Sequence, residues 1–100
     1  MPIATKKLRS NRAWIERHIN DPFVKRSRSE GYRARSVYKL TELDDREKLL
    51  RPGLTVVDLG AAPGSWTQIV RERLTNKEGR LQGRIIAMDI LPMDPICLLY

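Results

Sequence analysis

The chain has 100 residues, of which 41% are hydrophobic and 31% charged, so it forms one domain at most and has an ordinary globular composition. No apolar run approaches the roughly 20 residues that a bilayer-spanning helix needs, so nothing in it indicates a membrane partner. The net charge is +7, and the excess lies in residues 1–51, which hold 14 Lys and Arg against 7 Asp and Glu, whereas residues 52–100 hold 5 of each kind. This one-sided charge favours nucleic acid, although a basic surface that only keeps the protein soluble is the simpler alternative.

The first half of the chain is predicted to be helical. Residues 1–9 show no periodicity and are expected to form a disordered basic tail. Ser10 or Asn11 can cap a first helix, and four of its residues share one apolar face: Trp14, Ile15, His18 and Ile19. The pair Asp21-Pro22 is typical of the cap and first position of a second helix over residues 22–30, which Gly31 ends.

A third helix is expected over residues 34–49, and the residues predicted on its buried side are Val37, Leu40, Thr41 and Leu43. Arginines in this half are interleaved with Tyr32 and Tyr38, a composition that favours contacts with nucleic acid. We therefore expect residues 10–51 to form a basic helical segment that docks RNA, with Arg33 and Arg35 among its contacts.

Residues 52–100 follow a different pattern. After a turn at residues 51–53, residues 54–59 are apolar and β-branched, which is typical of a strand buried on both faces. Helical spacing returns over residues 65–74, and four of these residues are expected to face inward: Trp66, Ile69, Val70 and Leu74. A polar loop over residues 76–83 leads to a second strand over residues 84–88. Strand, helix and strand in this order predict an α/β fold with a parallel βαβ unit.

The loop after the first strand, GAAPG, predicts a cofactor site. Gly60 and Gly64 let the backbone turn and approach a ligand, and Asp89 ends the second strand, where a carboxylate accepts hydrogen bonds from both hydroxyls of a ribose. The loop lacks the middle glycine of a dinucleotide site, and Pro63 removes a donor that a diphosphate needs. A ribose without phosphate fits better, and S-adenosylmethionine is such a ligand. The alternatives are that Trp66 belongs to the core and that Asp89 only caps a turn.

Three blocks, GYRARSVYKL, DLGAAPGSW and MDILPMDP, resemble the FtsJ family (also called RrmJ or RlmE) over residues 11–96. The resemblance implies a Rossmann-like, S-adenosylmethionine-dependent methyltransferase that 2′-O-methylates a uridine ribose in 23S ribosomal RNA of the large subunit, in the cytoplasm. It also implies that Gly64 and Trp66 line the methionine end of the cofactor and that Gly60 passes beneath it. Asp89 would bind the adenosine ribose, with Ile90 and Leu91 against the adenine, and Asp58 would fix the loop or reach the amino group.

The resemblance also implies a Lys-Asp-Lys-Glu set around the reacting hydroxyl, whose first lysine is Lys39. An exposed helix lysine without a catalytic role is the alternative. The other three residues of the set lie beyond this sequence in the family, and CLLY after MDPI departs from its pattern. We therefore expect an N-terminal fragment, with the C-terminal half missing, that binds the cofactor weakly and is inactive alone. A non-catalytic RNA-binding module, or a related methyltransferase of transfer RNA or an mRNA cap, remains an alternative.

The single cysteine, Cys97, has no disulfide partner and no Cys or His partner at zinc-binding spacing. The sequence therefore predicts no metal site, and a reducing cytoplasmic compartment is the simplest reading.

Overall fold

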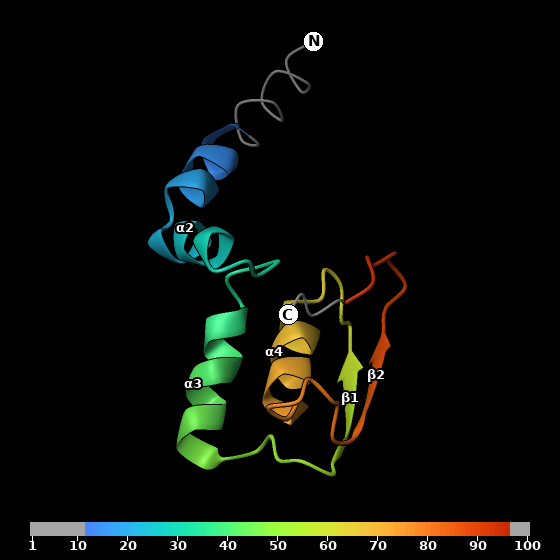
Figure 1. Ribbon diagram of the computed structural model, residues 1–100. Coiled ribbons are helices and arrows are strands. Elements are labelled where there is room, and N and C mark those ends of the chain that lie inside the picture. Colours follow the sequence, from blue (N-terminus) through green and yellow to red (C-terminus); the bar gives the residue numbers. More distant parts are fainter. Residues whose placement is uncertain (1–11, 97–100) are drawn as a thin grey trace.

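The computed structural model describes residues 12–96, so the predicted tail at 1–9, the cap at Ser10 or Asn11, and Cys97 lie outside the described residues. Residues 12–20 are helical and are followed by α2 (Pro22–Ser29), α3 (Val37–Glu47), β1 (Thr55–Leu59), α4 (Ser65–Leu74) and β2 (Arg84–Met88). In Figure 1, α4 lies between α3 and the two strands, and the earlier helices extend away from this layered part. The α/β class and the order of elements are confirmed.

The helix starts and ends follow from local hydrogen bonds. The Asp21 carboxylate accepts a hydrogen bond from the Phe23 N–H and caps α2, as the Asp-Pro pair predicts. The third helix is shorter than the 16 residues over 34–49 that periodicity predicts. At its start, the backbone of residues 33–36 is drawn into contacts with α4. At its end, Lys48 adopts a left-handed conformation, and the Asp44 carboxylate accepts the N–H of Leu50.

The apolar face predicted for the first helix is not covered within the described residues. Trp14, Ile15 and Ile19 are 58%, 47% and 46% exposed, and the Trp14 indole stacks on His18 with ring centroids 5.0 Å apart. The predicted helix is present, and Trp14 and His18 lie on one side of it. Packing within residues 12–96 leaves this side exposed. Nor is any helix in that range both long and apolar enough to cross a bilayer.

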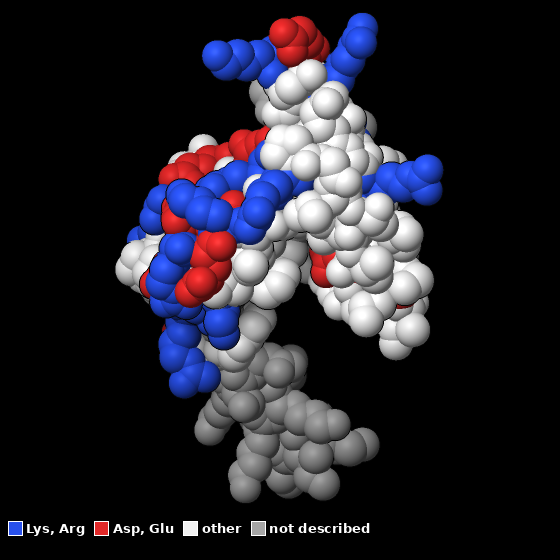
Figure 2. Space-filling model, turned by 90° about the horizontal axis from the view of Figure 1, so that it is seen from below, with Lys and Arg blue, Asp and Glu red and all other residues white. Residues whose placement is uncertain are grey.

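The two strands are parallel and in register, from Thr55 opposite Arg84 to Leu59 opposite Met88. Within residues 12–96, α4 packs against one face of this sheet and the other face is uncovered. The prediction that the first strand is buried on both faces is therefore wrong for the described residues: Val57 and Leu59 are 51% and 72% exposed. Figure 2 shows charged side chains gathered on the helical side of the molecule, whereas the opposite side is mostly uncharged.

The core forms where α3 and α4 meet, and its buried residues are Val37, Leu40, Ile69, Val70 and Leu74. Each buried side chain of this size stabilises the fold by about 1.5–3 kcal/mol. All five positions were predicted on the buried sides of these two helices, and all five are confirmed. Leu43 and Thr41 are only half-buried, and the fully buried neighbour on α3 is instead a carboxylate, Asp44.

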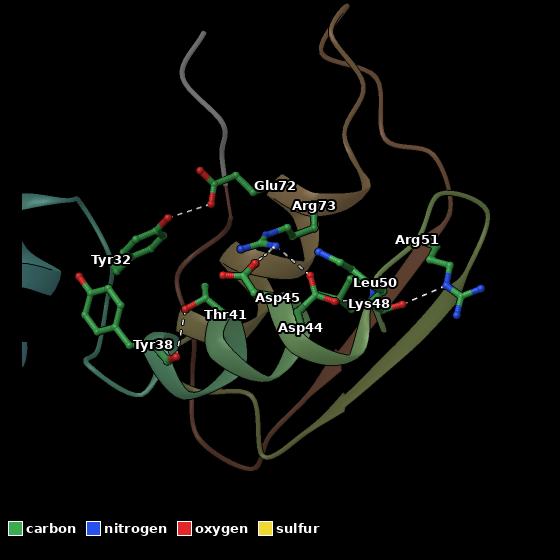
Figure 3. Close-up of polar contacts among 10 residues, drawn as sticks. All are labelled: Tyr32, Tyr38, Thr41, Asp44, Asp45, Lys48, Leu50, Arg51, Glu72 and Arg73. Carbon is green, nitrogen blue, oxygen red and sulfur yellow. Dashed lines mark hydrogen bonds and ion pairs between the residues drawn. The ribbon is translucent and has the colours of Figure 1, made fainter.

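Polar side chains join the same helices. Figure 3 shows Arg73 of α4 reaching Asp44 and Asp45 of α3, at 3.0 and 2.8 Å, so the buried Asp44 carboxylate is paired. The Tyr32 hydroxyl donates to the Glu72 carboxylate, at 2.9 Å. Burial, followed by this hydrogen bond, raises the pKa of Tyr32 to about 12, so the phenol is neutral at physiological pH. These contacts fix the segment before α3 against α4.

Candidate cofactor-binding site

The loop between β1 and α4 lies where both strands end. Because the strands are parallel and in register, Gly60 follows β1 at the level where Asp89 follows β2. The backbone N–H groups of Gly60 and Ala61 both donate to the Met88 carbonyl, at 2.8 and 3.0 Å. The predicted meeting of the glycine loop and the second strand's carboxylate is therefore present in the structure.

The two glycines of the loop have different surroundings. Gly60 has a φ of 72°, and nothing lies within 4 Å of the position where a Cβ would stand. Its Cβ position therefore faces open space, as the close approach of a ligand requires. Gly64 has a φ of 111°, but its Cβ position lies 2.9 Å from Arg33 Nη1 and 3.1 Å from Met93 Sδ. That Gly64 lines the cofactor stays a prediction, and in this structure the Arg33 guanidinium lies beside the position that a Cβ would take.

Asp89 ties the loop to the end of β2. Its Oδ2 accepts the Ala62 N–H at 2.9 Å, and its Oδ1 accepts the Leu91 N–H at 2.8 Å. The Leu91 N–H, followed by that of Ala62, holds the pKa of Asp89 below its ordinary value. The carboxylate is thus charged at neutral pH, and the tie weakens only as the pH falls through that lowered pKa. The alternative of a turn residue is in part correct, because the bond to Leu91 is a turn contact.

A pocket of about 290 Å³ opens on the loop. Its lining is formed by the end of β1, the loop, the start of α4 and one residue before α3: Asp58, Leu59, Gly60, Ala61, Ala62, Pro63, Ser65, Trp66 and Ser36. Gly60 and Trp66 therefore line the same pocket, whereas Gly64 and Asp89 are not among its lining residues, and the Asp89 carboxylate contacts the lining at the Ala62 N–H. Ile90 and Leu91, beside Asp89, are 100% and 62% exposed.

Trp66 does not belong to the core, so the prediction that it faces inward is wrong. Trp66 is 37% exposed, and its indole N–H donates to the Ser36 carbonyl at 2.8 Å, which holds the ring in the lining of the pocket. The hydroxyls of Ser36 and Ser65 lie 2.9 Å apart. Asp58 fixes the start of α4, since its Oδ2 accepts the Thr67 hydroxyl at 2.7 Å. Sequence reasoning missed Ser36, because nothing in its spacing indicates contact with α4.

Lys39 lies in a neighbouring hollow of about 490 Å³, between α2 and α3, lined by Phe23, Arg35, Ser36, Tyr38, Lys39 and Glu42. Ser36 lines both hollows, so it links Lys39 to the glycine loop. Lys39 itself is exposed on the first turn of α3. This placement leaves its ammonium group accessible to solvent beside the pocket.

The predicted RNA contacts Arg33 and Arg35 both have partners within the chain. Arg35 Nη1 lies 3.1 Å from the Asp21 carboxylate, next to the α2 cap. Arg33 donates to backbone carbonyls of the loop and of the segment after β2. Exposed basic residues of the first two helices remain available, among them Arg12, Arg17, Lys25 and Arg28. Within residues 12–96, no group of three or more His, Cys, Asp or Glu side chains is arranged for a metal ion.

Comparison with known proteins identifies the family. The family model described as FtsJ-like methyltransferase matches residues 32–98, which include the loop, Lys39 and Asp89. The chain belongs to the FtsJ-like methyltransferase family. The resemblance read from the GYRARSVYKL, DLGAAPGSW and MDILPMDP blocks is thereby confirmed, and an origin of these FtsJ-like blocks by chance is excluded.

Curated relatives of the chain are named ribosomal RNA large subunit methyltransferase E. The protein from Ralstonia nicotianae is 54% identical over 94 residues, which are 90% of this chain and 42% of the relative. The one from Delftia acidovorans is 52% identical over 99 residues, 96% of this chain and 46% of the relative. The one from Azoarcus sp. is 54% identical over 91 residues, 91% of this chain and 42% of the relative. The chain thus spans less than half the length of the relatives that it matches.

Proposed function

We propose that this chain is the cofactor-binding part of an S-adenosylmethionine-dependent enzyme that methylates the 2′-oxygen of a uridine in 23S ribosomal RNA. The observation that carries the proposal is the hydrogen bond between the Asp89 carboxylate and the Ala62 N–H of the glycine loop, at one end of the sheet, in a chain of the FtsJ-like family. The partner is then RNA of the large ribosomal subunit, and the compartment is the cytoplasm. A Rossmann-like sheet, completed by further strands, is the fold that we propose for the whole protein.

The residues of the site suit the two ends of this cofactor. Each oxygen of the Asp89 carboxylate accepts one backbone N–H and keeps a further lone pair, so both oxygens are able to accept ribose hydroxyls. The exposed Ile90 and Leu91 offer apolar surface to the adenine. The pocket at Gly60 and Trp66, at about 290 Å³, is near the lower limit of ligand sites and fits the methionine end better than the whole molecule.

Lys39 would act on the RNA. S-adenosylmethionine, when bound, supplies an electrophilic methyl group. The ribose 2′-hydroxyl is a poor nucleophile, so it must lose its proton as it attacks. The Lys39 ammonium, one turn beyond Ser36, would steer the hydroxyl and offset the negative charge that develops on its oxygen. The base that takes the proton would come from the part of the protein that follows these residues.

The test uses two proteins: the 100-residue chain, and a chimera in which residues 1–96 are joined to the remainder of the Ralstonia nicotianae relative. Isothermal titration measures S-adenosylmethionine binding, and methyl transfer is assayed on 23S RNA and on large subunits. We expect the chimera to bind and to methylate, and the chain alone to bind weakly without turnover. Micromolar binding by the chain would contradict the second expectation. RNA binding by a chimera that takes no S-adenosylmethionine would favour the non-catalytic module.

Lys39→Ala in the chimera should leave the cofactor's dissociation constant unchanged and reduce the maximal rate by roughly 100-fold, as loss of one charge-stabilising group does. Lys48→Ala is the matched control, because Lys48 ends the same helix away from the pocket. Full activity of Lys39→Ala would show that this lysine is an exposed helix residue without a catalytic role.

A further inference from the structure

Arg33 connects three segments that are distant in the sequence. Its Nη1 donates to the Pro63 carbonyl at 2.9 Å and to the Asp94 carbonyl at 2.7 Å, and its Nη2 donates to the Pro95 carbonyl at 2.6 Å. Its backbone N–H donates to the Gln68 side chain of α4, at 2.9 Å. One side chain before α3 thus holds the glycine loop and the segment after β2 at the same time.

The two segments that Arg33 joins are poorly able to pair with each other. Both contain proline, which has no N–H, so neither Pro63 nor Pro95 can donate to a neighbouring carbonyl. The donors must come from elsewhere, and a guanidinium presents five N–H groups in a planar fork. A lysine ammonium carries the same charge but is a single point on a flexible stem, so it cannot occupy the carbonyls of both segments with this geometry.

Gly64 completes the arrangement. A Cβ at this position would stand 2.9 Å from Arg33 Nη1, 3.0 Å from Ile96 Cδ1 and 3.1 Å from Met93 Sδ. The first distance is shorter than real Cβ atoms show and the other two are tighter than most Cβ contacts, so the glycine leaves room for Arg33 and residues 93–96 to lie over the loop. Because Gly64 has no side chain, Arg33 and residues 93–96 are able to pack against the glycine loop.

We propose that Arg33 is a positioning residue, which locks residues 93–96 onto the glycine loop and thereby fixes the loop for the cofactor, rather than an RNA-binding residue. The proposal rests on the proposed function for the identity of the cofactor. The arginine belongs to the basic segment, yet its donors point inward at carbonyls. It also precedes Ser36, whose carbonyl holds Trp66, by three residues. The segment before α3 therefore contacts the glycine loop through Arg33 and the start of α4 through the Ser36 carbonyl.

The deciding variant is Arg33→Lys, which keeps the charge and removes the fork. Arg80→Lys is the matched control, because Arg80 lies in the loop after α4 and its described hydrogen bonds are made by its backbone N–H and carbonyl. In the 100-residue chain, nuclear Overhauser contacts of the Gly64 α-protons with the Met93 and Ile96 methyl groups report the locked segment. We expect Arg33→Lys to lose these contacts and Arg80→Lys to keep them. Retention of the contacts in Arg33→Lys would overturn the proposal.

Kinetics of the chimera separate positioning from RNA binding and from general loss of structure. For Arg33→Lys we expect the KM for S-adenosylmethionine to rise by at least tenfold, while kcat at saturating cofactor, the KM for RNA and its salt dependence stay unchanged. A raised KM for RNA with an unchanged KM for the cofactor would assign Arg33 to RNA and refute the lock. If the unmodified chimera bound no S-adenosylmethionine, the proposed function would fail, and the Gly64 contacts would still decide the role of Arg33.

Discussion

The loops at the two ends of α4 are built in opposite ways. The loop before α4, residues 60–64, is held by side chains from other segments: Asp89 binds its Ala62 N–H and Arg33 binds its Pro63 carbonyl. In the loop after α4, residues 75–83, the turn at residues 76–80 closes on itself, and the end of the loop joins another segment where the Gln82 carbonyl accepts the Gly53 N–H. In this turn the Asn76 side chain accepts the N–H groups of Glu78 and Arg80, and the Asn76 carbonyl accepts the Gly79 N–H.

In this βαβ unit the candidate site lies at the loop whose shape depends on distant residues. A loop that supplies its own hydrogen bonds is a connection, and its shape is set by local sequence. A loop that depends on residues 27 to 30 positions away keeps its shape only while those elements stay in place. Substitutions in the two loops should therefore affect cofactor binding and stability in different proportions.

The largest effect is expected at Gly64. Alanine there must adopt a φ of 111°, which L side chains rarely adopt, and its Cβ would displace the Arg33 guanidinium that ties the loop to the segment after β2. We expect Gly64→Ala to abolish detectable cofactor binding by the chimera in isothermal titration and to lower the free energy of unfolding by about 1–3 kcal/mol.

Gly79→Ala, in the other loop, is the matched control. Gly79 has a φ of 81° but nothing within 4 Å of its Cβ position, so backbone strain is the only cost. Gly79→Ala should lower the free energy of unfolding and leave the cofactor's dissociation constant unchanged. If both variants lost binding equally, the contrast between the loops would be wrong.

A smaller effect is expected at Asp89. Asp89→Ala frees the Ala62 N–H and removes the proposed ribose acceptor, so the dissociation constant for S-adenosylmethionine should rise several-fold or more, with little change in RNA affinity. Glu78→Ala removes an exposed carboxylate from the self-closed loop and should leave both affinities unchanged. Trp66 fluorescence in a Trp14→Phe background follows the titration, since these are the only two tryptophans. Equal affinities in both variants would remove Asp89 from the site.

The smallest effect is expected at Asn76. Asn76→Ala removes an acceptor for two backbone N–H groups and should lower the free energy of unfolding by about 1 kcal/mol in chemical denaturation. The cofactor's dissociation constant should not change. Asn76→Asp keeps the acceptor and should restore stability. A cofactor defect in Asn76→Ala would mean that the two loops are coupled through α4.

The sequence predicts the local structure well and the long-range contacts poorly. The limits of α4 and β2 and the Asp21 cap follow from periodicity and capping, which are local, and the parallel pair follows from the order strand, helix, strand. The meeting of Gly60 and Asp89 also follows, because parallel strands end at one edge. Trp66 was assigned to the core because apolar spacing cannot show that its indole N–H has a partner 30 residues away. The role of Arg33 was missed for the same reason.

The uncovered face of the sheet has a consequence for work in solution. Val57, Leu59, Ile86 and Met88 project from the same face of the strand pair and are all about half exposed or more. Exposed apolar surface of this kind promotes self-association, and the strand edges beside it add unpaired backbone groups. A preparation of these 100 residues should therefore become more oligomeric as it is concentrated, and sedimentation at several dilutions ought to precede any titration.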